Sequence, residues 1–457
     1  MAGGGHVAAP NAPDGGWGWM VVMASFTLQA LTIGITYTFG VIFVDLLDYF
    51  KESQSITAWI GSIQPCLLYL TGIVSGPLIR RFGWRKVTIF GSILSAVGFA
   101  SSALANNVYV LYFTYGVMTG IGNGLMYVTS MVAVQHYFDK RRAMATGLAV
   151  SGSGVGTLTF GLLTRSLTDR LGWRWALVVE GGIMLLGVVC GAIFRPLPQN
   201  ESNEDTKLEA EANKTDEVVD QSPFEQEEPG CCKRSCDCID LSYLKNPVFI
   251  IYCFSILMFC FGYHVPYTYT PERARQLGID SKSSSFLVSV MGMANVGSRL
   301  LFGWVADRSK GVRFYLAGIM LTLGGVVSVA IPLFTTYPLM VLYSVMFGSF
   351  TGSWASLFPV ILVDLLGIDS IERSLGQCLA AGSIAFLLAS PISGLIIEGT
   401  GGNFDTPFIV MGSAEAVGGL VFFFIKCVQR RDTEYQTIDE DEDEGARRQR
   451  YISESFS

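Results

Sequence analysis

The chain has 457 residues, of which 50% are hydrophobic and only 15% are charged. Soluble domains carry roughly 25% charged residues, so this composition excludes an ordinary soluble protein and predicts a membrane protein. The formal net charge of −7 is concentrated in two polar segments, 200–228 and 439–444. It therefore indicates nothing about the charge of a substrate, and we expect no nucleic-acid partner.

Residues 1–17 precede the first apolar run and are expected to form a short N-terminus. Met1–Pro13 contains no lysine, no arginine and no apolar core, so it lacks the pattern of a cleavable signal peptide. The run that begins near Trp17 is long enough to be a first membrane span. Trp17 and Trp19 would anchor it at the membrane interface, where indole rings prefer to lie.

Twelve apolar runs are long enough to cross a hydrocarbon core of roughly 30 Å, which takes about 20 residues. The first six are 18–44, 56–79, 87–106, 109–134, 143–165 and 175–194. The second six are 248–269, 284–306, 314–333, 337–363, 376–397 and 407–427. The sequence therefore predicts an all-α membrane protein with two six-helix bundles, 18–194 and 248–427.

A polar insert, 195–247, separates the two sets of runs. It cannot bury enough apolar surface to fold alone, so we expect a disordered linker, and we expect a solvated acidic tail over 428–457. The cysteine spacing in "CCKRSCDC" does not match the paired ligands of a zinc site. Reversible palmitoylation and no modification are both open for Cys231, Cys232, Cys236 and Cys238.

The two halves share a pattern between their second and third runs. "GPLIRRFGWRK" occupies 76–86 and "GWVADRSKGVR" occupies 303–313, each with a glycine, a charge doublet, a second glycine and basic residues. A parallel repeat of six helices is typical of major-facilitator transporters. Their substrate site lies between the halves near the middle of the membrane.

Lysine and arginine in the short loops predict the orientation. Eleven fall on the side that would hold both termini and the insert, and seven fall on the other side. Because cytoplasmic loops carry the excess of positive charge, we expect both termini and the insert in the cytoplasm.

Two stretches resemble the signatures of the monocarboxylate transporter family. They are "DGGWGWMVV" (Asp14–Val22), before the first run, and "YFDKRRAMATGLAVSGSGVG" (Tyr137–Gly156), before the fifth. "LKNPVF" (244–249) and "HVPYTY" (264–269) are also similar. In the second signature, Lys140, Arg141 and Arg142 would face the anionic inner leaflet. The resemblance implies a plasma-membrane carrier of organic acids or amino-acid-like solutes. Many members move a proton with the substrate, and some require a single-span immunoglobulin-like partner.

Arg299 lies near the middle of the eighth run. A charge there costs at least ~2.5–3.5 kcal/mol on insertion scales, so its side chain should face the bundle interior. A guanidinium matches a carboxylate with two parallel hydrogen bonds, which favours a clamp for a substrate carboxylate. The alternative is a buried ion pair with Glu180 or Glu415. By resemblance, Arg299 matches the substrate arginine of the family's eighth helix.

Three positions depart from the pattern of the proton-coupled family members. Asn295, one turn before Arg299, stands where those members have an aspartate. Tyr37 stands where they have a lysine in the first helix. The tenth-helix aromatic that sets substrate size falls at Pro359, beside Phe358, by ungapped count. The usual proton-carrying and charge-relay groups are therefore missing.

Other polar groups in the apolar runs are candidates for proton coupling or for the cavity wall. His264, Glu180 and Glu415 could carry a proton, since an ionisable residue inside a membrane is a functional candidate, although each could also serve helix packing. Asn123, Tyr127 and Trp354 could line the cavity.

We therefore expect an alternating-access carrier of a larger monocarboxylate or an amino-acid-like solute, either secondary-active or facilitative. A proton-coupled lactate or pyruvate symporter is the first alternative, and a non-transporting membrane scaffold or receptor is the second. No nucleophile–base pair and no set of metal ligands occurs in the apolar runs, so we expect neither an enzyme nor a metal or cofactor.

Overall fold

The computed structural model describes residues 13–52, 54–195, 246–308, 310–426 and 428. Every regular element in these ranges is a helix. Nearly all of the expected linker and acidic tail lies outside the described residues, and so do the four linker cysteines.

The first half of the chain forms the helices expected over 18–194. Its elements are α1 (Trp17–Gln29), the π-helix η1 (Ala30–Gly34), α2 (Phe39–Phe50), α3 (Gln54–Leu70), α4 (Gly72–Ser102), α5 (Val108–Leu111), the π-helix η2 (Tyr112–Met118), α6 (Thr119–Tyr137), α7 (Arg142–Leu171), α8 (Trp173–Met184) and α9 (Leu186–Ile193).

The second half repeats this arrangement. Its elements are α11 (Pro247–Gln276), α12 (Ser281–Ala306), α13 (Lys310–Val329), η5 (Ile331–Leu333), α14 (Tyr337–Leu366), η6 (Ile368–Ser370), α15 (Ile371–Gly399) and a last helix, Asp405–Lys426.

The number of spans depends on how α4 is divided. Ten helices of the described chain are each long and apolar enough to cross a membrane, and α3 with α4 forms a bent pair that can count as an eleventh. Within α4 the backbone leaves the helical region at Gly83, where φ is 79° and ψ is 158°, a conformation that a residue with a Cβ rarely adopts. The sequence predicts two runs here, 56–79 and 87–106, on either side of Gly83.

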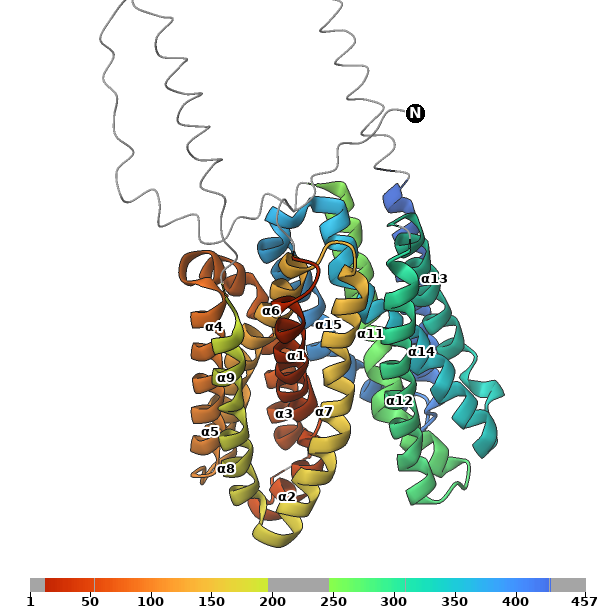
Figure 1. The fold of residues 1–457 in the computed structure, drawn as a ribbon. Helices are drawn as coiled ribbons and strands as arrows, with labels where there is room; N and C mark the ends of the chain where they lie inside the picture. The colour runs from red at the N-terminus through yellow and green to blue at the C-terminus, as the bar shows by residue number, and fades with distance from the viewer. Residues whose placement is uncertain (1–12, 53, 196–245, 309, 427, 429–457) are drawn as a thin grey trace, which may run out of the picture.

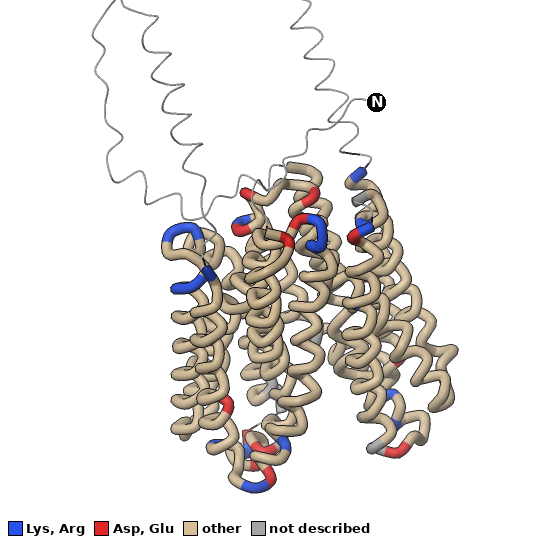
Figure 2. Tube along the Cα trace, in the orientation of Figure 1, with Lys and Arg blue, Asp and Glu red and all other residues tan. Residues whose placement is uncertain are grey.

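The charged residues gather at the two ends of the bundle. Figure 2 shows lysine, arginine, aspartate and glutamate in clusters at the top and bottom, with few of them in between. Large apolar side chains such as Phe113 and Phe424 are exposed. This distribution suits a protein whose middle is surrounded by hydrocarbon.

The two halves lie side by side, and several helix pairs join them in two main regions (Figure 1). In the first, α7 crosses α12 so closely that a Cβ on Gly303 would lie 2.8 Å from the carbonyl oxygen of Ala143. In the second, α3 and α4 contact α15, and a Cβ on Gly376 would clash with the carbonyl oxygen of Gly72. Small residues at such crossings let membrane helices pack backbone to backbone.

Candidate functional site

A cavity of about 520 Å³ lies between the halves and is here called the outer cavity. Its wall comes from the first span and α7 on one side, and from α11 and α12 on the other. The polar members of the wall are Tyr37, Ser153, Thr157, Tyr263, His264, Tyr267, Thr268, Ser289, Asn295 and Arg299.

A second, smaller cavity of about 80 Å³ is here called the aromatic cavity. Tyr37, Ser153, Tyr263 and Arg299 belong to the walls of both cavities, so the two adjoin. Its aromatic members are Tyr37, Tyr69, Tyr127, Phe259, Tyr263, Trp354, Phe358 and Phe386.

Arg299 is the buried charge at the junction of the two cavities, with only 4% of its surface exposed. Its Nη1 donates hydrogen bonds to the Val150 carbonyl and to Ser153 Oγ, the latter at 2.6 Å, so α7 of the first half orients a side chain of the second. Among the described residues, Arg299 Nε has no hydrogen-bond partner and no carboxylate forms an ion pair with the guanidinium. The guanidinium therefore has donor capacity to spare beside the cavity.

The alternative of an ion pair with Glu180 or Glu415 is not seen. Glu180 accepts a hydrogen bond from Thr164 Oγ1 at 2.5 Å, inside the first half. Glu415 is buried inside the second half, and neither glutamate belongs to the wall of either cavity.

Asn295 and Tyr37, which the sequence predicts to bind substrate, both lie on the wall of the outer cavity. Asn295 is 3% exposed, and its Nδ2 donates to Thr351 Oγ1 at 3.4 Å. Tyr37, on the first span, belongs with Arg299 to the walls of both cavities. Together these residues place neutral hydrogen-bonding groups around the charge.

The expected wall residues Tyr127, Trp354 and Phe358 belong to the aromatic cavity. Four further aromatic members were not predicted: Tyr69 of α3, Phe259 and Tyr263 of α11, and Phe386 of α15. The rings of Tyr69 and Phe386 stack across the halves at 4.7 Å with an interplanar angle of 5°. A single aromatic residue in an apolar run has the same sequence pattern as a core residue, so only the pairing of the two halves reveals them.

Asn123 was expected on the cavity wall, but the structure places it elsewhere. Its Oδ1 accepts a hydrogen bond from Ser95 Oγ at 2.7 Å, which joins α6 to α4 inside the first half. His264 does line the outer cavity, where its Nε2 lies 3.3 Å from Thr268 Oγ1.

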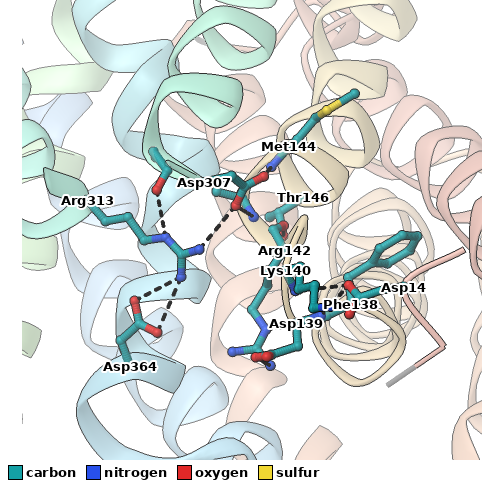
Figure 3. Close-up of polar contacts among 12 residues, drawn as sticks. Asp14, Phe138, Asp139, Lys140, Arg142, Met144, Thr146, Asp307, Arg313 and Asp364 are labelled. Atoms are coloured by element: carbon teal, nitrogen blue, oxygen red, sulfur yellow. Dashed lines mark hydrogen bonds and ion pairs between the residues drawn. The ribbon is translucent and has the colours of Figure 1, made fainter. Parts of the chain in front are cut away.

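One end of the bundle is closed by contacts between the halves. This is the end at which the described chain stops at Arg195 and resumes at Asn246, here called the insert end. Asp307, which follows α12, accepts hydrogen bonds from the backbone N–H groups of Ala143 at 2.9 Å and Met144 at 2.8 Å, in the first turn of α7 (Figure 3). A carboxylate is favourable at a helix N-terminus because the first N–H groups have no partner within the helix.

Arg313 forms ion pairs with Asp307 and with Asp364. Its Nη2 lies 3.2 Å from Asp307 Oδ1, and its Nη1 lies 3.2 Å from Asp364 Oδ2 (Figure 3). Burial raises the pKa of the Asp307 carboxyl above its ordinary value, while the two N–H groups and Arg313 oppose that rise.

A second contact closes the insert end between α4 and α15. Arg80 Nε lies 3.1 Å from Glu372 Oε2, and its Nη2 donates to the Asp369 carbonyl at 2.5 Å. The helix α7 begins at the closed insert end. The wall of the outer cavity reaches Gly161 and Leu162, which lie in the C-terminal half of α7, away from that end.

Comparisons of this chain with known proteins show its family and its fold. Residues 25–376 and 270–450 match the family model of the Major Facilitator Superfamily. The chain is 32% identical over 423 residues to monocarboxylate transporter 12 of Xenopus laevis, with 92% of this chain and 90% of that protein covered. It is 29% identical to monocarboxylate transporter 12 of Homo sapiens, with 95% and 85% covered. It is 28% identical to monocarboxylate transporter 14 of Homo sapiens, with 92% of each covered.

A solved structure has the same fold. The proton:xylose symporter XylE, bound to 6-bromo-6-deoxy-D-glucose, matches with a TM-score of 0.69 over 89% of this chain and 95% of that chain, at 15% identity. The major facilitator fold predicted from the repeat is thereby confirmed. The chain is a multi-pass membrane transporter and not an enzyme, and it belongs to the monocarboxylate transporter family of the Major Facilitator Superfamily.

Proposed function

We propose that this protein carries a carboxylate-bearing solute across the plasma membrane by alternating access, in a secondary-active or facilitative mode. The observation that supports this most is the cavity-side guanidinium of Arg299, which is buried and has no carboxylate partner among the described residues. A buried unpaired charge is costly, and a substrate carboxylate would supply the missing counter-charge and two hydrogen bonds.

The size and chemistry of the cavities favour a larger organic acid or an amino-acid-like solute. The outer cavity alone encloses about 520 Å³, within the range of small-molecule sites. In this proposal Asn295 and Tyr37 bind polar groups of the substrate, and Tyr127, Trp354 and Phe358 contact its apolar part. The names of the relatives, monocarboxylate transporters 12 and 14, agree with a carboxylate substrate.

The closed insert end suggests which state the structure represents. With both termini in the cytoplasm, as the distribution of lysine and arginine indicates, the contacts of Asp307 and Arg80 close the cytoplasmic side. Transport then requires these contacts to break while the cavity closes on the other side. A single-span immunoglobulin-like partner belongs to the proposal through the family resemblance alone.

Uptake by cells that lack endogenous transport tests the proposal. Labelled lactate, pyruvate, aromatic amino acids, creatine and carnitine are offered at acidic and near-neutral pH. We expect uptake of at least one of the larger solutes. Strong lactate uptake confined to acidic pH would instead support the proton-coupled lactate symporter. No uptake of any carboxylate, with normal surface expression, would support a scaffold.

Arg299→Lys keeps the charge but loses the planar fork. We expect it to reduce uptake at least tenfold at unchanged surface expression. The matched control is Arg308→Lys, on an exposed arginine just beyond the same helix, which should leave uptake intact. Unchanged uptake in Arg299→Lys would remove Arg299 from the substrate site.

A further inference from the structure

Glu415 is a buried carboxyl group with no visible partner. It lies on the last helix, Asp405–Lys426, and is 0% exposed. Neither of its carboxyl oxygens has a hydrogen-bond partner in the described part of the chain, and no ion pair there includes it. The Glu415 carboxyl therefore differs from the other buried acid of the bundle, Glu180, which accepts a bond from Thr164.

Two glycines make room for this carboxyl group. A Cβ on Gly262 of α11 would clash with Oε2, and a Cβ on Gly324 of α13 would lie 2.7 Å from Oε1. The side chain thus fills a space that both neighbouring helices leave open for it. Such a fit places the carboxyl group in one fixed position between α11 and α13.

The groups that face Glu415 are neutral. Its titratable neighbours are Cys260 and Tyr263 on α11 and Tyr343 on α14. On α13 the facing residue is Gly324, and the α13 arginine, Arg313, is held at the insert end by Asp307 and Asp364. A carboxylate anion in hydrocarbon without a counter-charge or a donor is strongly unfavourable, so these surroundings favour the neutral form of the carboxyl group.

Glu415 lies directly behind the wall of the cavities. The Thr351 hydroxyl accepts the hydrogen bond of Asn295 Nδ2, and the Thr351 methyl carbon lies 3.6 Å from the same Gly324 Cβ position that adjoins Glu415 Oε1. Cys260, two residues before Gly262 on α11, belongs to the wall of the aromatic cavity. Thr351 therefore lies between Glu415 and the cavity-wall residue Asn295, which itself offers no ionisable group.

We propose that Glu415 is a proton-binding site of this carrier, placed behind Asn295 and Thr351. The carboxyl group is protonated in the conformation with a closed insert end. When the helices around it move and admit water, it releases H⁺ to that water and becomes a carboxylate. It takes up a proton again from the other side of the membrane, after the insert end has closed. The coupling of this cycle to the substrate rests on the proposed function, whereas the protonation of Glu415 does not.

Infrared spectroscopy of the purified full-length protein in lipid tests protonation without a substrate. Wild type should show the C=O stretching band of a protonated carboxylic acid near neutral pH. Glu415→Gln keeps the shape and should lose the largest part of that band, while Glu180→Gln controls for the other buried acid. If Glu415→Gln fails to fold, Glu415→Asp should shift the band. A band that neither variant at position 415 alters would overturn the proposal.

Proteoliposomes with a pH-sensitive dye inside then test coupling, using a carboxylate that the uptake panel has identified. Wild type and Glu180→Gln should move protons with the substrate. Glu415→Gln should lose at least nine-tenths of that proton movement but keep substrate exchange. Equal proton movement in Glu415→Gln would overturn the coupling. If wild type transports no carboxylate, the proposed function fails, and the infrared result still decides whether Glu415 binds a proton.

Discussion

Asp307 at the end of α12 caps the first turn of α7 through Met144, so a carboxylate of one half binds the helix N-terminus of the other. The same segment is held from its other side by Asp14, whose Oδ1 accepts hydrogen bonds from the N–H groups of Asp139 and Lys140, each at 2.9 Å. The two family signatures thus contact each other, and Asp307 connects both to the second half. The segment 137–144 therefore joins the first span to the second half of the chain.

Asp307→Asn should loosen the insert end. The amide keeps the shape but loses the charge that favours the α7 N-terminus, and hydrogen bonds to charged groups contribute roughly 1.5–3 kcal/mol. Because about 1.4 kcal/mol is a tenfold change in an equilibrium, the open population should rise at least tenfold. Spin labels at the exposed positions Lys140 and Arg308 should be farther apart than in wild type, as measured by electron paramagnetic resonance.

The control for that variant is Asp139→Asn. Asp139 pairs with Arg142 at 3.2 Å within the first half and does not join the halves. In Asp139→Asn, the distribution of distances between the labels at positions 140 and 308 should match that of wild type. An equal change in both variants would show that charge at this end, and not the cap on α7, sets the position of the halves.

Asp14→Ala should lower stability without opening the insert end. It removes two hydrogen bonds to the backbone inside the first half, a change of the kind that costs about 0.5–2 kcal/mol at a helix cap. Trp19 and Phe138, whose rings lie 5.1 Å apart, would still hold the first span against this segment. Thermal unfolding of the purified protein should show a lower midpoint, with the 140–308 distance unchanged. A longer distance in Asp14→Ala would mean that the first signature controls opening directly.

The sequence predicts the fold and the central charge well because both depend on local patterns. Twelve apolar runs and one repeated loop motif define the helices, and Arg299 stands out as an arginine within such a run. The sequence interpretation was wrong for Arg142, which was expected to face the lipid leaflet. It is 3% exposed and donates to the Phe138 carbonyl at 2.8 Å, because the chain turns there and leaves that carbonyl outside a helix.

Contacts between distant residues could not be predicted from one sequence. Tyr69 and Phe386 stack across the halves, although each is only an aromatic residue in an apolar run. Asn123 shows the converse, since it is polar in such a run and yet bonds Ser95 within one half. The pattern shows that a side chain is inside the bundle, and only the packing of the helices shows which neighbour it meets.

Gly376→Ala should also open the insert end, by a steric route. The added methyl would clash with the carbonyl oxygen of Gly72, and overpacking of this kind typically costs 1–3 kcal/mol. Gly394→Ala is the matched control, because it lies on the same helix and a Cβ there meets nothing within 4 Å. The 140–308 distance should lengthen only in the first variant. If both variants match wild type, α15 does not limit the approach of the halves.

Asn295→Asp should weaken substrate binding by competing for Arg299. An aspartate one turn before an arginine lies on the same helix face and can pair with it, so the substrate carboxylate would lose its counter-charge. We expect KM to rise about tenfold near neutral pH, which corresponds to about 1.4 kcal/mol. Protonation of the new aspartate would free Arg299, so the ratio of uptake at acidic pH to uptake at neutral pH should exceed that of wild type. Asn295→Ser, which removes the amide without adding an acid, should keep the wild-type ratio. The same ratio in both variants would show that position 295 does not act through Arg299.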